Sequence, residues 1–159
     1  MLQVDKVIKL KNILEEDFER RKIVINAFYD AFKSVFSSNS VEKLRVVSPM
    51  VFSVRTQAIN ARNKIQELKI DDPLFRSAQE ILEKEHQYLS RVYENYVEKT
   101  FFRDADRDWV LKNLDIDSLK TFSIELNRLR MAEELLFDQI NRFFGDVSEQ
   151  KRIALGRFK

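Results

Sequence analysis

The residue types best suited to chemistry in this chain are one histidine and a run of aspartates. His86 is the only histidine, and it follows Glu83 in a Glu-x-x-His pattern. A di-iron carboxylate site in a helical bundle needs two such motifs and two further glutamates. A zinc site with two imidazoles needs a second histidine. One histidine is too few for either centre, so we interpret His86 as a solvated or capping side chain.

The aspartates between residues 104 and 115 have the spacing of a calcium loop. They occupy positions 1, 3, 5 and 12 of an EF-hand frame, as Asp104, Asp106, Asp108 and Asp115. Position 6, normally a glycine that permits a sharp turn, is Trp109, and position 12 lacks the bidentate glutamate. Aspartate also caps helices, and two helix starts are expected here. We therefore predict no metal site, with divalent-cation binding at 104–115 as the alternative.

Other catalytic patterns are missing from the sequence. The only glycines are Gly145 and Gly156, so no glycine-rich loop can hold a phosphate. The chain has no cysteine, which removes thiol nucleophiles and cysteine–zinc sites. One histidine on a helix face supports no serine–histidine–acid arrangement. We predict no catalytic residue, no cofactor and no metal, and hence a protein that is not an enzyme.

Composition favours a single domain, residues 1–159, in a reducing compartment. The length of 159 residues suits one domain. The absence of cysteine fits the cytoplasm, and the charged start shows no signal-peptide pattern. No apolar run is long enough to span a bilayer. The net charge of +2 comes from 28 basic and 26 acidic residues spread over the chain, which makes non-specific nucleic-acid binding an unfavoured role.

Apolar residues recur every 3.5–3.6 positions, and we call each such line of side chains a seam. The seams predict four long helices, near residues 2–36, 49–68, 73–102 and 117–144. Short connections favour antiparallel neighbours. The expected fold is an all-α, elongated antiparallel four-helix bundle with coiled-coil-like seams. Three short accessory helices are expected in addition, at 41–47 before Pro49, at 109–114 after an acid-rich interruption, and at 149–155. Gly145 is expected just past the end of the fourth long helix.

Charged residues interrupt the apolar seams at a few positions. They are Lys11, Arg21, Glu85, Lys99 and Glu133. A polar residue at a core position can set the register of packed helices, and a long charged side chain can instead extend to solvent from a helix end. We expect one of these two roles for each.

Aromatic residues widen the apolar face of the third long helix. The predicted partner-binding set is Tyr88, Tyr93, Tyr96, Phe101, Phe102 and Trp109. Tyrosine and tryptophan are enriched at binding hot spots, whereas core packing of a helix between two neighbours would also produce a wide apolar face. We predict a non-enzymatic interaction module of the adaptor, chaperone or inhibitor type. Its partner would be another protein or a second copy of the chain, as a dimer.

A nucleic-acid-associated bundle is the alternative function. It would use Arg55, Arg62 and Lys64 together with the basic C-terminal tail, which holds Lys151, Arg152, Arg157 and Lys159. Salt-dependent binding to nucleic acid would separate the two functions.

Overall fold

The computed structural model describes residues 3–38, 41–97, 108, 112 and 116–156, and all of its regular structure is helical. It contains four long helices and one π-helical turn, with no strand in the described part of the chain. The elements are α1 (Val4–Ser38), α2 (Glu42–Glu67), α3 (Pro73–Val92), η1 (Tyr93–Val97) and α6 (Ile116–Gly156). No described helix combines the length and the apolar character that crossing a membrane requires.

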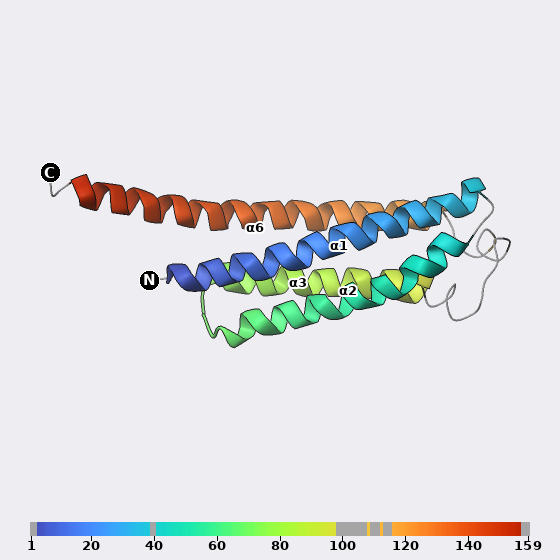
Figure 1. Cartoon of the computed structure of the whole chain (residues 1–159), viewed down its shortest axis with the longest axis horizontal. Helices are drawn as coiled ribbons and strands as arrows, with labels where there is room; N and C mark the ends of the chain where they lie inside the picture. The colour runs from blue at the N-terminus through green and yellow to red at the C-terminus, as the bar shows by residue number, and fades with distance from the viewer. Residues whose placement is uncertain (1–2, 39–40, 98–107, 109–111, 113–115, 157–159) are drawn as a thin grey trace.

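The helices run alternately up and down the long axis of the molecule (Figure 1). Helix α2 packs against both α1 and α3, while α6 packs against α3 and less closely against α1. Both chain termini lie at the same end, and the last turns of α6 extend beyond the other helices there (Figure 1). The prediction of an elongated antiparallel four-helix bundle is confirmed.

The start of α3 follows the capping signal in the sequence. Asp72 is the N-cap residue, and its side chain accepts a hydrogen bond of 2.8 Å from the backbone N–H of Leu74. Pro73 occupies the first turn, where a missing N–H costs nothing. Lys69, in the preceding turn, has a positive φ of 54°. These local features reverse the chain between α2 and α3.

The predicted break before Pro49 is wrong, because α2 continues through the proline as one helix. A proline inside a helix removes one backbone hydrogen bond and costs about 3 kcal/mol. The apolar side chains on either side offset this cost, since Leu44, Val47, Val51 and Val54 are all buried on one face. Ser48 is also buried, and its hydroxyl donates to the carbonyl of Leu44 at 2.6 Å. Packing of this face therefore outweighs the local stop signal.

The predicted end of the last long helix at Gly145 is also wrong. Helix α6 continues to Gly156, so the expected accessory helix at 149–155 is part of it. Gly145 has no positive φ, although a left-handed conformation is what favours glycine after a helix end. The third accessory helix, at 109–114, lies largely outside the described residues.

Replacing Gly145 with alanine is expected to stabilise the last turns of α6 by about 1 kcal/mol, because glycine is a poor helix former. An added Cβ would meet nothing within 4 Å, so the alanine brings no clash. Hydrogen exchange of the amides in 146–156 should slow up to about fivefold. Faster exchange would show that Gly145 ends a helix instead of continuing it.

The core consists of two apolar clusters along the bundle. The proximal cluster, nearer the termini, contains Val7–Phe18 of α1, Leu74–Leu82 of α3 and Leu129–Ile140 of α6 among its contributors. The distal cluster contains apolar residues from Ile25 onward in α1, with Tyr88, Leu89 and Val92 of α3. The two clusters meet between Phe18 and Ile25 in α1, where the chain places its buried charges.

Candidate functional site

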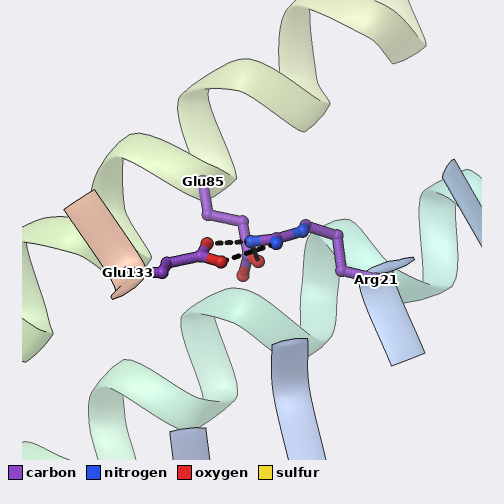
Figure 2. Close-up of polar contacts among 3 residues, drawn as sticks. All are labelled: Arg21, Glu85 and Glu133. Carbon is purple, nitrogen blue, oxygen red and sulfur yellow. Dashed lines mark hydrogen bonds and ion pairs between the residues drawn. The ribbon is translucent and has the colours of Figure 1, made fainter. Parts of the chain in front are cut away.

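Arg21 of α1 lies at the centre of a buried group of charges (Figure 2). Its Nη1 donates to Oε1 of Glu85 on α3 at 2.5 Å. Its guanidinium also binds both carboxylate oxygens of Glu133 on α6, with Nη2 2.7 Å from Oε2. Arg21, Glu85 and Glu133 are 3%, 0% and 6% exposed. One side chain therefore connects three helices in the interior of the bundle.

Asp17, one turn before Arg21, adds a third buried carboxyl group. Its side chain is hydrogen-bonded to that of Glu85. Asp17 Oδ2 and Glu85 Oε2 are both buried without a hydrogen-bond partner, so we infer that a proton shared between the two carboxyl groups satisfies both. Burial, together with the Asp17 carboxyl group, raises the pKa of Glu85 well above its ordinary value of 4.5. We therefore treat Glu85 as a protonated donor to Asp17.

The same burial acts on the other two carboxyl groups. It raises the pKa of Asp17, although the hydrogen bond with Glu85 and the charge of Arg21 oppose the rise. It also raises the pKa of Glu133, although Arg21 again opposes the rise. With all three carboxyl groups ionised, three negative charges would face the single positive charge of Arg21 in the interior. The charge cluster, meaning Asp17, Arg21, Glu85 and Glu133, is thus a network that binds at least one proton.

The pH dependence of stability should reveal this proton. A carboxyl group with a raised pKa stabilises the fold fully below its unfolded-state value, near 4.5 for Glu85, and this contribution is lost as pH rises through the folded-state pKa. The free energy of unfolding of the wild type should therefore fall, relative to Glu85→Gln, by up to about 1.4 kcal/mol per pH unit in that window. Urea titrations from pH 4 to 8 measure the difference.

Glu80→Gln provides a matched control, because Glu80 is an exposed glutamate on the same helix. This control should follow the wild-type pH dependence closely. A Glu85→Gln variant whose stability changes with pH as the wild type's does would contradict a buried, proton-binding Glu85.

An open groove of about 960 Å³ lies between α1 and α6, directly beside the charge cluster. Arg21 and Glu133 line it, with Phe18 and Phe137. The Phe18 and Phe137 rings meet edge to face, with centroids 5.7 Å apart. The Arg21 guanidinium and the Glu133 carboxylate already bind one another, so neither is free to react with a molecule in the groove. In the described part of the chain, no group of three histidine, aspartate or glutamate side chains is arranged to hold a metal ion.

The predicted polar interruptions of the seams account for most of this cluster. Arg21, Glu85 and Glu133, three of the five residues, meet in space and connect α1, α3 and α6. Lys11 instead extends from a helix edge, with its amine 5.8 Å from the Phe144 ring centroid. Lys99 lies outside the described residues. Sequence reasoning missed Asp17, whose only signal is its position one turn from Arg21.

The predicted aromatic set divides into a buried residue and a surface residue. Tyr88 is only 2% exposed, and its hydroxyl lies 2.5 Å from that of Tyr29. Its ring meets Phe122 of α6 edge to face, with centroids 6.1 Å apart. Tyr88 therefore belongs to the distal cluster, and it is not on the surface where a partner could reach it.

Tyr93 lies at the surface, half-buried beside Phe52 of α2. The Phe52 and Tyr93 ring centroids are 5.6 Å apart. The Arg55 guanidinium lies 5.5 Å from the Phe52 centroid and 4.9 Å from the Tyr93 centroid. We call these three residues the aromatic patch. Of the remaining predicted residues, Phe101, Phe102, Trp109 and the Tyr96 side chain lie outside the described part of the structure.

The other candidate residues make ordinary contacts between helices. His86 Nδ1 lies 3.1 Å from the backbone carbonyl of Arg55, so its N–H donates across the α2–α3 contact. Arg62 is 3.7 Å from Glu83 of α3, and Lys64 is exposed. Most of the predicted 104–115 aspartates lie outside the described residues.

No protein-family model, no curated protein and no solved structure matches this chain.

Proposed function

We propose that this chain is a non-enzymatic protein-interaction module that binds a partner through the aromatic patch. The proposal rests on one observation: Phe52 is 47% exposed, and its ring packs with Tyr93 under a shared arginine. Large aromatic rings bury much area at low entropic cost, and tyrosine and arginine are enriched in binding hot spots. We include a cytoplasmic location in the proposal, since the chain has no cysteine.

The arrangement of the patch supports the proposal. Arg55 holds the two rings by cation–π contacts, which lowers the entropy that a partner would have to remove on binding. The π-helical turn η1 carries Tyr93, and π-helical turns occur frequently at functional sites.

An affinity capture from lysate, read by mass spectrometry, tests the proposal. The bait is the full chain, compared with the double variant Phe52→Ala, Tyr93→Ala. A matched control truncates two exposed apolar residues of α1, Ile8→Ala and Ile23→Ala. We expect one protein to be captured by the wild type and the control but lost from the patch variant. Equal capture by all three baits, or no specific capture, would contradict the proposal.

A nucleic-acid-associated bundle is the competing function. Its candidate residues Arg55 and Arg62 already contact aromatic rings and a carboxylate, which reduces the charge they offer to phosphates. Titration of a duplex at several salt concentrations distinguishes the two functions. Affinity that falls steeply with salt, and that survives Phe52→Ala, Tyr93→Ala, would favour nucleic acid.

A further inference from the structure

The outer face of α6, opposite its packed face, carries an unexpected line of exposed apolar residues. Ile124, Met131 and Leu135 are 55%, 69% and 57% exposed. The packed face consists of Leu129, Glu133, Leu136 and Ile140 with their neighbours, all buried. At 100° per residue, 131 and 135 lie on the side of the helix directly opposite 133 and 140.

The exposed line continues with charged residues at heptad spacing. Alternating steps of four and three residues from Ile124 give Arg128, Met131, Leu135, Asp138 and Arg142, and all six side chains are exposed. We call these six positions the outer seam. Such spacing is that of the a and d positions of a coiled coil, which pack against a second helix. The other three long helices lie on the opposite side of α6 and leave this seam uncovered.

We propose that two copies of this chain associate through the outer seams of their α6 helices, which pack antiparallel. The two-fold axis crosses the outer seam at the level of residue 133, midway between Met131 and Leu135. In a two-fold interface, residues equally distant from the axis face one another. Met131 then faces Leu135 of the second copy, and Leu135 faces its Met131. Further out, each Arg128 faces an Asp138, and each Ile124 packs on the stem of an Arg142.

Charge complementarity favours this register. It also favours a second copy of the chain as the partner that covers the outer seam. A parallel pair would bring Arg128 against Arg128 and Asp138 against Asp138, which repel. An antiparallel pair shifted by one heptad would place Arg128 against Met131 and Asp138 against Thr121, so neither charge finds its opposite. Only the register centred at 133 both packs Met131 against Leu135 and pairs Arg128 with Asp138.

The same geometry limits the strength of the association. The apolar centre contains only two residues per copy, and exposed ion pairs contribute little and are screened by salt. Glu134 flanks the axis, so the two copies bring like charges toward each other. The expected product is a weak, concentration-dependent dimer of the kind formed by small interfaces. This association uses a face of the molecule separate from the aromatic patch and does not depend on the proposed function.

A charge-exchange experiment tests the proposal with the full chain. Analytical ultracentrifugation from roughly 10 μM to 1 mM covers the range expected for a small interface. We expect the wild type to form dimers, and Arg128→Asp alone or Asp138→Arg alone to be monomeric. An equimolar mixture of these two variants should dimerise, because each Asp then faces an Arg. The variant carrying both substitutions should also dimerise.

Several controls keep the result interpretable. All the substituted positions are exposed, so circular dichroism should show the wild-type helix content in every variant. Glu134→Gln should strengthen the dimer, and Leu135→Ser should abolish it. A wild type that stays monomeric throughout this range would overturn the proposal. A dimer that the single variants leave unchanged, or that the mixture fails to restore, would equally overturn it.

Discussion

Substitution of Arg21 by methionine is expected to lower the free energy of unfolding by about 3–5 kcal/mol. Methionine fills a similar volume but leaves Glu133 and the Asp17–Glu85 pair buried without a cation. Removing one partner of a buried ion pair is strongly destabilising, because the remaining charge has lost its water as well as its partner. Urea denaturation monitored by circular dichroism measures the loss.

The neighbouring Arg20 provides a matched control. It forms an exposed ion pair with Glu16 at 3.0 Å in an i,i+4 arrangement on the same helix. Arg20→Met should change stability by at most about 0.5 kcal/mol, since exposed ion pairs are worth little. An Arg21→Met variant as stable as Arg20→Met would show that the charge cluster is not buried as the structure describes it.

Removing the whole charge cluster should have a much smaller effect than removing its cation. Apolar residues of similar volume at all four positions (Asp17→Leu, Arg21→Met, Glu85→Met and Glu133→Met together) join the proximal and distal clusters into one core. Replacing a buried ion network in this way is often neutral or stabilising by about 1–4 kcal/mol. Urea denaturation of the fourfold variant measures the effect, and stability at or above the wild-type value would indicate that the cluster specifies which helices meet and adds little net stability.

Truncation of Tyr88 is expected to cost about 3–5 kcal/mol, the range for a buried aromatic residue replaced by alanine. Tyr88→Ala removes a ring packed on Phe122 and one hydrogen bond of the Tyr29 hydroxyl. Tyr93→Ala, five residues along the chain, should cost only about 1 kcal/mol because its ring is partly exposed. Thermal and urea denaturation of the two single variants measure the contrast.

The contrast separates a core residue from a surface residue within the aromatic set predicted to bind a partner. Tyr88→Phe isolates the hydroxyl pair and should cost about 1 kcal/mol, the typical value of one hydrogen bond. If Tyr93→Ala were as destabilising as Tyr88→Ala, the Tyr93 ring would belong to the core. The aromatic patch would then lose its support as a binding surface.

The sequence by itself was sufficient to predict the fold class and most of the buried face of each helix. Buried positions such as Leu14, Phe28, Leu82 and Leu136 lie on the apolar seams. The cap at Asp72 was predictable because a side chain and a proline determine it within three residues. Local signals of this kind depend only on the neighbouring residues, so the sequence alone is enough to identify them.

Only the tertiary structure decided that α2 continues through Pro49. The stop signal at Pro49 is weaker than the packing of the buried face that continues on both sides of it. Helix α6 continues past Gly145 without such packing, because the described side chains from 146 onward are exposed or half-buried. A local preference of about 1–3 kcal/mol is overridden when the apolar side chains beyond it are packed. The residue order alone does not contain that packing energy, because it depends on which distant helix lies alongside.

The tertiary structure also decided the role of each unusual side chain. From the sequence, Arg21, Glu85 and Glu133 were interruptions with two candidate roles, and Tyr88 and Tyr93 were equivalent members of one face. Three helices far apart in the chain bring the charges within hydrogen-bond distance, and Phe122 of α6 packs on the buried Tyr88, whereas Tyr93 stays partly exposed beside Phe52. Periodicity determines which side of a helix is apolar, whereas burial depends on the neighbours that cover that side, and the sequence pattern does not specify them.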